Sequence, residues 1–224
     1  MEKLKKILEV VKNGLKKFIH PLAITGALIL ICGLIFPLAM TGISQLIMHD
    51  KANGSIIEVD GNKVGSELVG QKFTEDFFLW GRPSAVDYNT YYEDENGNKV
   101  DANGNPFTGP ASGSQNLGPT NPDLEDRVKN DLEEFLEKNP GVKKEDIPTD
   151  LLTASGSGMD PHISPKSAAI QLPRVSKASG ISIEELEKIV KDNTKGKLLG
   201  IFGEETVSVL GVNLAIAEKM GKIQ

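Results

Sequence analysis

A single uncharged apolar run near the N-terminus limits what this chain can fold into. Residues 18–49 contain no Asp, Glu, Lys or Arg, and the densest part reads LAITGALILICGLIFPLAMTGISQLIM. A helix needs about 20 predominantly apolar residues to cross the roughly 30 Å of hydrocarbon in a bilayer. The run is long enough to span a membrane once, and no later segment repeats it. The sequence therefore predicts a tail over 1–17, a transmembrane helix over 18–49 and one water-facing domain over 50–224.

Lysines gather on the N-terminal side of this run. Six precede it, at positions 3, 5, 6, 12, 16 and 17, whereas Lys51 is the only one close behind it. Because flanking Lys and Arg stay on the cytoplasmic side of a span, we expect the tail inside and the domain outside. A cleaved signal peptide would need an apolar core of about 7–15 residues and a small-x-small cleavage site. The core is longer and SQLIMHDKANG offers no such site, which favours an uncleaved anchor.

The composition narrows the functions open to the outer part. The whole chain has 25 basic and 31 acidic residues. The tail holds six of the basic and two of the acidic residues, so the rest of the chain has 19 basic and 29 acidic residues, a balance of −10. An acidic surface argues against nucleic-acid binding, which needs a basic stripe. Cys32 is the only cysteine and lies within the apolar run, so the outer part has no disulfide.

Within the run, several residues indicate a helix that packs against others. Pro37 removes a backbone hydrogen bond and tends to kink a helix. Gln45 near the outer end is placed to bond a neighbouring helix. Small residues, which let membrane helices approach closely, occur at Thr25, Gly26, Gly33, Thr41, Gly42 and Ser44. A lone anchor that tolerates these residues is the alternative; we favour a packed helix in an oligomer.

After the run, local patterns mix strands and helices. Alternating apolar residues around Asp60-Gly61 predict a β-hairpin. A loop-rich stretch holds an apparent insertion at about 93–110, expected to form a small hairpin or a mobile flap. Helix signals are Asn121-Pro122 before 122–138, Ser164-Pro165 before a helix toward Gln171 that Pro173 interrupts, and a Ser182/Glu185 capping box. The final TVSVLGVNLAIAEKM is expected to start as a strand and close with a helical turn. Without regular βα alternation, the fold class is α+β.

Two apparent ligand motifs fail on their spacing. Asp-x-Asn-x-Asn occurs at Asp94 and at Asp101, but Lys99 and Pro106 stand where a calcium loop needs Gly for its sharp turn. GSELVGQK has the glycine spacing of a phosphate loop, but Gln replaces the Lys that must follow the second Gly. Both segments are interpreted as turns and strands, and no metal site is expected.

Asp160-Pro161-His162 is the nearest approach to a catalytic constellation. The other histidines are His20 and His49, so no His-x-x-His ligand pair for zinc exists. The GSG at 156–158 lacks the Gly-x-Ser-x-Gly spacing of a nucleophile elbow. His162 is therefore interpreted as a hydrogen-bonded turn residue, and the residues alone make no case for catalysis.

The order of segments is more specific than any one of them. A Lys-rich start is followed by FPLAMTG, VGSELVGQKF, FFLWGRPSAVDYN, ASGSQNLGPTNPDL, DIPTDLLTASGSGMDPHISPKSA, AIQLPRV and VSVLGVNLAI. Over nearly the whole chain this resembles the C subunit of the Kdp high-affinity potassium-transporting ATPase. The stretch over 93–110 is longer than expected for that family.

The resemblance implies a single-span, non-catalytic subunit of a bacterial plasma-membrane complex that hydrolyses ATP and imports potassium. Its implied partners are a channel-like potassium-binding subunit, a P-type ATPase subunit and a very small hydrophobic subunit, in contact with membrane lipid. The family is described as a catalytic chaperone that raises the ATP affinity of the ATPase subunit. ATP and potassium are thus expected at the level of the complex, with no cofactor assigned to this chain.

The implied role conflicts with the expected topology, because ATP is cytoplasmic and the charge rule puts the domain outside. We therefore hypothesise a structural clamp docked on the channel-like subunit, with any effect on ATP affinity passing through the span. Gln171 is a weaker candidate for a nucleotide base, and Arg174 for a structural ion pair. Candidates for partner contact are Pro37, Gln45, Arg82, Ser84, Tyr88, Asn89, Ser112, Gly113, Asn116, Asn121, Asp160, His162 and Ser164. For the Gly and Pro members, turn geometry alone is the alternative.

Two other functions remain open from the sequence. One is a membrane-anchored extracytoplasmic hydrolase that uses Asp160 and His162. The other is a free-standing solute or cation sensor. Turnover of an ester or peptide lost in His162→Ala would favour the hydrolase, and potassium-dependent stabilisation of the domain would favour the sensor.

Overall fold

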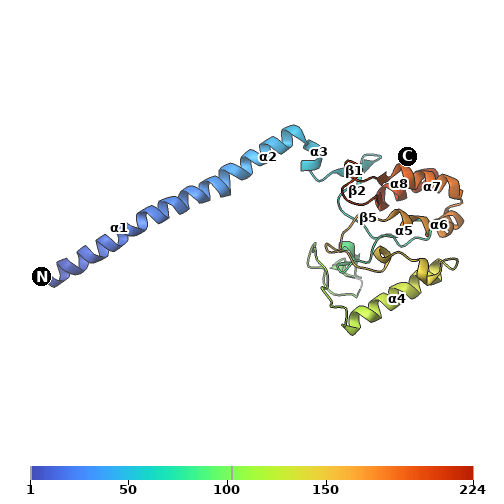
Figure 1. Ribbon diagram of the computed structural model, residues 1–224, viewed down its shortest axis with the longest axis horizontal. Helices are drawn as coiled ribbons and strands as arrows, with labels where there is room; N and C mark the ends of the chain where they lie inside the picture. Colours follow the sequence, from blue (N-terminus) through green and yellow to red (C-terminus); the bar gives the residue numbers. More distant parts are fainter. Residues whose placement is uncertain (1, 102, 224) are drawn as a thin grey trace. The chain divides into compact units, whose positions relative to one another are not determined.

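The chain divides into two compact units, residues 1–54 and 55–224. The computed structural model describes residues 2–101 and 103–223, with the side chains of all of these except 3–13 and 15. Figure 1 shows a long helical N-terminal unit and a C-terminal domain of mixed helix and sheet. Each unit is described by itself.

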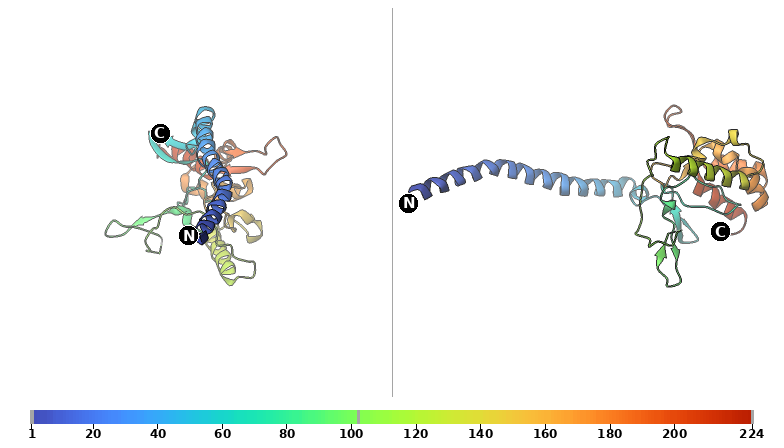
Figure 2. Two further views of the ribbon diagram at one scale, coloured as in Figure 1. Left: turned by 90° about the vertical axis from the view of Figure 1, so that its left-hand side faces the viewer. Right: turned by 90° about the horizontal axis from the view of Figure 1, so that it is seen from below.

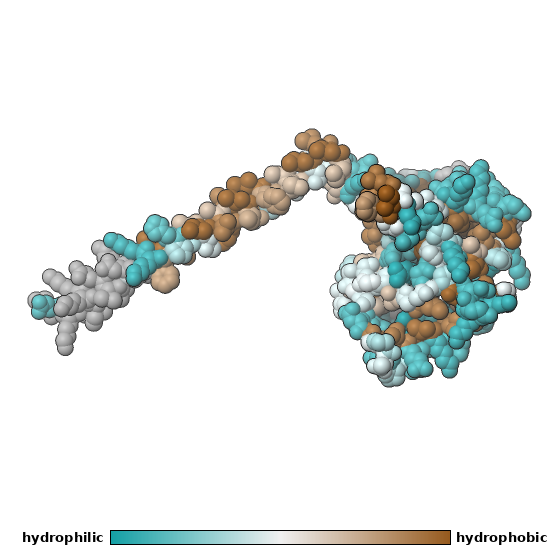
Figure 3. Space-filling view, in the orientation of Figure 1, coloured by the Kyte–Doolittle hydropathy of each residue, from teal (hydrophilic) through white to brown (hydrophobic). Residues whose placement is uncertain are grey.

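The N-terminal unit is helical throughout. Its elements are α1 (Glu2–Leu30), a π-helical turn (Ile31–Ile35), α2 (Phe36–Ile47) and α3 (His49–Ala52). The segment Lys16–Ile47 is long and apolar enough to cross a membrane, and none of its most apolar window is buried within the chain. Its apolar surface runs along the helix in Figure 3. The helix ends two residues before the expected boundary because Met48 leaves helical geometry, at φ −143°.

Pro37 changes the helix one turn before itself. A proline lacks the N–H that would bond the carbonyl four residues back, and its ring crowds that carbonyl. The chain accommodates this by widening residues 31–35 into a π-helical turn, in which the Phe36 N–H bonds the Ile31 carbonyl. Such π turns within α-helices are common at functional sites. Near the end of α2, the Gln45 amide exchanges hydrogen bonds of 3.1 and 3.2 Å with Asn53.

The C-terminal domain contains short antiparallel sheets and helices, which confirms the mixed α and β content. Its strands are β1 (Ile56–Val59), β2 (Asn62–Ser66), β3 (Tyr92–Glu93), β4 (Lys99–Val100), β5 (His162–Ile163), β6 (Thr194–Lys195) and β7 (Thr206–Ser208). The helices are α4 (Pro122–Lys138), α5 (Pro165–Ala169), α6 (Leu172–Ser179), α7 (Ile183–Asp192) and α8 (Val209–Lys219). Strands β1 and β2 form one hairpin, β3 and β4 another, and β5-β7-β6 a third sheet.

Both expected hairpins are present. Val59 pairs with Asn62 across Asp60-Gly61, whose φ angles of 52° and 74° are those of a tight turn that matches the twist of the strands. In the insertion, Tyr92 pairs with Val100. The Asp94 carboxylate accepts backbone N–H groups of Asn96 and Asn98, both at 2.8 Å. The calcium-like motif therefore closes a turn.

Three of the helices begin at the capping residues that the sequence indicates. Asn121 caps α4, Ser164 caps α5 and Ser182 caps α7 through their side chains. Pro173 does not simply interrupt a helix: it lies in the first turn of α6, where its missing N–H has no partner to lose. The C-terminal segment starts as a strand, as expected, but the expected closing turn is a full helix that begins where the Ser208 hydroxyl accepts the Gly211 N–H.

The core lies between these helices and the β5-β7-β6 sheet. Fully buried side chains include Leu79, Ile163, Val175, Leu186, Val207, Val212 and Ile216. Two buried amides attach the segment before residue 81 to this core. Asn213 bonds both the N–H and the carbonyl of Leu79, at 2.8 and 2.9 Å. Gln171 does the same for Trp80, at 2.9 and 3.2 Å.

Candidate functional site

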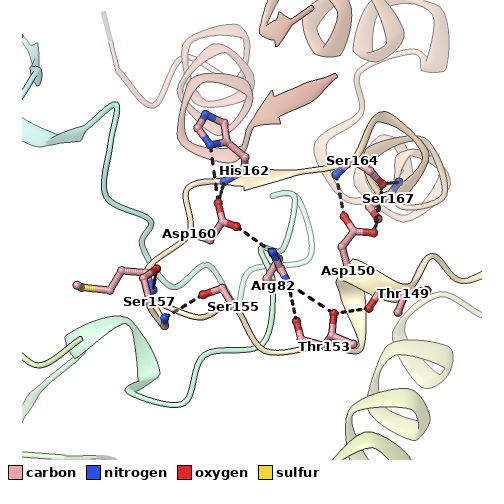
Figure 4. A network of polar contacts seen from close by, with 12 residues as sticks. Arg82, Thr149, Asp150, Thr153, Ser155, Ser157, Asp160, His162, Ser164 and Ser167 are labelled. Carbon is pink, nitrogen blue, oxygen red and sulfur yellow. Dashed lines mark hydrogen bonds and ion pairs between the residues drawn. The ribbon is translucent and has the colours of Figure 1, made fainter. Parts of the chain in front are cut away.

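Three loop segments meet in the C-terminal domain and hold one another by polar contacts. They are residues 81–89, 111–114 and 153–162, called the loop clasp below. Eight of the candidate residues lie in it: Arg82, Ser84, Tyr88, Asn89, Ser112, Gly113, Asp160 and His162. Figure 4 shows the part of the clasp around Arg82. The sequence blocks that suggested the family resemblance thus meet in space.

Arg82 and Asp160 form the central pair. Arg82 Nη1 lies 3.0 Å from Asp160 Oδ2, with each side chain about a quarter exposed (25% and 26%). Arg82 Nη2 donates to the Thr153 carbonyl at 3.3 Å, and Asp160 Oδ1 accepts the backbone N–H of His162 at 3.0 Å. The carboxylate therefore bridges an arginine and a turn (Figure 4).

Ser84 holds a left-handed turn in place. Asp87, Tyr88 and Asn89 have φ angles of 46°, 53° and 57°, a region that is costly for bulky residues. Ser84 Oγ accepts the Tyr88 N–H at 2.9 Å and donates to the Gly158 carbonyl at 2.5 Å. Backbone strain of this kind persists only where the surroundings impose it, and here Ser84 supplies part of that constraint.

The Tyr88 side chain fills the space behind the turn. Its hydroxyl donates to the Arg82 carbonyl at 2.7 Å. A Cβ on Gly70 would lie 2.7 Å from the Tyr88 ring, and one on Gly81 would lie 2.7 Å from its hydroxyl. Burial raises the pKa of Tyr88 to about 12, with the nearby Asp160 charge adding to the shift. The Tyr88 phenol is thus uncharged near neutral pH. It also lies so close to Gly70 and Gly81 that a larger residue at either position would collide with it.

Asn89 and Ser112 attach the middle segment. The Asn89 amide bonds both the N–H and the carbonyl of Ala111, at 2.8 and 2.9 Å, as a neighbouring strand would. Ser112 Oγ and the Gly113 N–H both donate to the Ser157 carbonyl, at 3.2 and 2.9 Å. Residues 111–113 are therefore held from both sides.

The remaining candidates lie outside the clasp. Asn116 pairs with Ser114, and Asn121 caps α4. Ser164 donates through its N–H and hydroxyl to Asp150, at 2.7 and 3.2 Å. Pro37 and Gln45 belong to the other unit. None of the partner-contact candidates lines the cavity of about 760 Å³ beside α6, whose walls include Lys138, Val142, Ile170, Pro173 and Arg174.

For Gln171 the structure favours a structural role. Its side chain has no exposed surface, and besides Trp80 its amide bonds the Ser167 carbonyl at 3.0 Å and Arg174 at 2.7 Å. No atom of the amide is open to a nucleotide base. Arg174 is likewise buried, but its partners are neutral oxygens rather than the expected carboxylate.

Sequence reasoning missed Thr153 and Ser155 as members of the clasp. Thr153 accepts from Arg82 and donates through its hydroxyl to the Thr149 carbonyl at 2.8 Å. Ser155 Oγ accepts the Gly158 N–H at 2.9 Å. Serine accepting an N–H three residues ahead is a known turn signal, so the pattern Ser-x-x-Gly was available. The long-range partner of Thr153 was not.

His162 is a partly buried side chain of the clasp whose charge depends on pH. Burial lowers its pKa below the usual 6.5, with Asp160 opposing and Lys195 reinforcing the shift. The described residues offer its Nε2 no hydrogen-bond partner, while Nδ1 lies 3.7 Å from Asp160 Oδ1. The environment therefore favours the neutral imidazole over the protonated one. Most polar atoms of the clasp are thus paired, whereas Arg82 Nε, Asp87 Oδ2 and His162 Nε2 are buried without a hydrogen-bond partner among the described residues.

Acidification is expected to destabilise the C-terminal domain through His162. Because its pKa is lower in the folded protein, the unfolded chain binds more protons below pH 6.5, so the free energy of unfolding falls as pH drops below that value. Thermal unfolding of the detergent-solubilised protein at pH 7.5 and 5.5 measures this. The fall should be smaller in His162→Gln. An equal fall in both proteins would contradict the assignment to His162.

Comparison with known proteins covers almost the whole chain. Residues 18–218 match the family model described as KdpC: K+-transporting ATPase, c chain. The potassium-transporting ATPase KdpC subunit of Clostridium kluyveri is 54% identical over 209 residues, 93% of this chain and 95% of that protein. That of Clostridioides difficile is 56% identical over 202 residues, 90% and 97% of the two chains. That of Caldanaerobacter subterraneus subsp. tengcongensis is 44% identical over 198 residues, 88% and 93%. With this coverage and identity, the chain belongs to the KdpC family of potassium-transporting ATPase subunits.

Proposed function

We propose that this chain, an accessory subunit of the Kdp potassium-transporting ATPase complex, is non-catalytic and stabilises the assembly by docking its C-terminal domain on the channel-like subunit. The other partners proposed are the P-type ATPase subunit and the small hydrophobic subunit, which the span would meet within the plasma membrane. One observation carries the proposal. Most polar side chains of the loop clasp bond one another or backbone groups, which suits a docking scaffold of defined shape.

The hydrolase alternative lacks support from the same geometry. A catalytic histidine must lie within hydrogen-bond reach, about 2.6–3.2 Å, of the nucleophile that it activates. Among the residues that the structure describes, no hydroxyl or other group bonds His162 Nε2. The Asp160 carboxylate is directed mainly at Arg82 and a backbone N–H. These roles support a structural site.

The cation-sensor alternative is also weakened. Both acidic motifs of the insertion direct their carboxylates to turn groups: Asp94 to Asn96 and Asn98, Asp101 to Asn103 and Asn105. Within the described residues, no group of three or more His, Cys, Asp or Glu side chains is placed to hold a metal ion.

We further propose that the N-terminus is cytoplasmic and the C-terminal domain extracytoplasmic. The asymmetry of lysines around the span supports this orientation. A catalytic-chaperone effect that raises the ATP affinity of the ATPase subunit would then be an allosteric coupling carried by the span. The π-helical turn before Pro37 is the irregular point along that path.

Cysteine labelling in intact cells tests this orientation. In a Cys32→Ser background, Asn103→Cys is expected to react with a membrane-impermeant maleimide added outside. Both Asn103 and Lys17 are exposed, so Lys17→Cys is a matched control expected to react only after the cells are permeabilised. The reverse pattern would overturn the outward orientation and with it the proposed docking site.

A further inference from the structure

The loop between β6 and β7 ends in four exposed apolar side chains. Leu198, Leu199, Ile201 and Phe202, called the apolar tip below, are 70, 82, 76 and 62% exposed. The loop projects away from the rest of the C-terminal domain in both views of Figure 2, where it is the orange-red loop. Single exposed apolar residues are ordinary, but a contiguous apolar group on a surface marks an interaction site.

The turn at the tip is closed by backbone hydrogen bonds and contains a residue that is unfavourable at its position. Leu198 and Phe202 exchange backbone hydrogen bonds of 2.8 and 3.0 Å, and the Leu198 carbonyl also accepts the Ile201 N–H at 3.2 Å. Between them Leu199 and Gly200 both have positive φ, 54° and 74°. Turns of this kind favour Asn-Gly or Asp-Gly, because a bulky residue at positive φ is strained.

A second turn in the same chain shows the ordinary solution. The β1–β2 hairpin turns through Asp60 and Gly61 at φ 52° and 74°, nearly the same backbone angles. At the tip, leucine occupies the place that aspartate holds there. Because Leu199 is 82% exposed, packing within the chain does not offset its strain. A residue that is unfavourable at its own backbone angles, with no packing to offset the cost, indicates a role in function rather than in folding.

The charges around the tip favour a protein over a lipid surface. Loops that insert into anionic membranes rely on flanking Lys and Arg. Here Lys195 is paired with Glu67 at 3.5 Å and Lys197 with Glu204 at 3.3 Å. Glu205, which is exposed, adds a further negative charge beside them. The rim is thus acidic on balance, like the rest of the domain.

We infer that the apolar tip is an anchor that inserts into an apolar pocket, with a neutral or basic rim, on the outer face of the channel-like subunit. This inference rests on the proposed outward orientation and docking. Binding energy at interfaces concentrates in a few apolar anchors that fill pockets. A hydrogen-bonded turn holds these side chains in place before binding, which reduces the entropy lost on association.

The variant Leu199→Asn separates binding from folding. Asparagine suits the positive φ of this position, so thermal stability of the full chain should stay equal or rise. Titration of the labelled full chain into complex prepared without it should show a Kd increased by about tenfold or more, as for loss of an interface anchor. Ile183→Asn, at an exposed apolar residue of α7, is the matched control and should leave the Kd unchanged.

A photo-crosslinking residue at position 199 identifies what covers the tip in membranes. We expect a cross-linked product that contains the channel-like subunit. Products with lipid alone, or with a second copy of this chain, would overturn the inference, as would a wild-type Kd for Leu199→Asn. If the wild-type chain itself fails to bind the remaining subunits, the proposed docking function fails as well.

Discussion

Replacing Arg174 by alanine is expected to lower the free energy of unfolding by about 3 kcal/mol, because an acceptor left buried without its donor costs about 1–3 kcal/mol and this change affects more than one. Arg174 as a whole is 8% exposed. Its Nη1 donates to the carbonyls of Asp76 and Phe78 at 2.7 and 3.0 Å. Its Nε and Nη2 donate to the side chains of Asn139 and Gln171 at 3.1 and 2.7 Å. Alanine would leave these four acceptors, two of them buried and two part-buried, without this donor.

The setting of Arg174 makes the loss larger than for an ordinary hydrogen bond. Burial lowers its pKa to about 10, so it stays charged near neutral pH, and hydrogen bonds to a charged donor are stronger than neutral ones. The guanidinium also lies over the Trp80 ring, 4.4 Å from its centroid. One side chain thus fastens the segment 76–80, the end of α4 and α6 together.

Two further variants make this test specific. Arg174→Lys keeps the charge but loses the planar fork, so it should lose an intermediate amount of stability. Lys177→Ala, on the exposed side of the same helix, should change stability by less than about 0.5 kcal/mol. Chemical denaturation of the detergent-solubilised chain measures all three. Equal stability of Arg174→Ala and Lys177→Ala would show that the network contributes nothing.

Local signals predicted much of the fold. The β1–β2 hairpin follows from Asp60-Gly61, and α4, α5 and α7 begin at their capping residues. Short-range chemistry suffices there because the turn or cap is satisfied by atoms within four residues. At the C-terminus the β-branched residues of TVSV favoured a strand. The strand is present over Thr206–Ser208, after which the Ser208 cap and burial at helical spacing give a helix longer than the expected single turn.

The links that assemble the domain could not be read in the same way. Asn213 bonds Leu79 across 134 residues, and Gln171 bonds Trp80 across 91. Nothing in a local window distinguishes such a buried amide from one that recognises a ligand, which is why Gln171 was a nucleotide candidate. Similarly, unusual sequence blocks marked the clasp residues. That many of them bond one another became clear only from their placement.

The clasp depends on a position where no side chain fits. Gly70→Ala is expected to lower the free energy of unfolding by about 3 kcal/mol, near the upper end for overpacking. A Cβ there would lie 2.5 Å from the Asp160 carbonyl oxygen and 2.7 Å from the Tyr88 ring. The Gly70 N–H already bonds the Met159 carbonyl at 2.9 Å. The segments around Gly70 and Asp160 therefore cannot move apart without losing that hydrogen bond.

Gly70→Ala should also displace the Arg82–Asp160 pair, because the added Cβ would collide with the carbonyl oxygen of Asp160. We therefore expect Gly70→Ala to reduce the amount of subunit recovered with the complex as well as its stability. Gly156→Ala is the matched control: it lies in the clasp, and its Cβ would meet nothing within 4 Å. Denaturation curves and recovery of both variants with the complex decide the matter. If Gly70→Ala behaves like Gly156→Ala in both measurements, close approach at Gly70 does not hold the clasp together. If it unfolds more easily yet is recovered normally, the clasp supports the fold without shaping the docking surface.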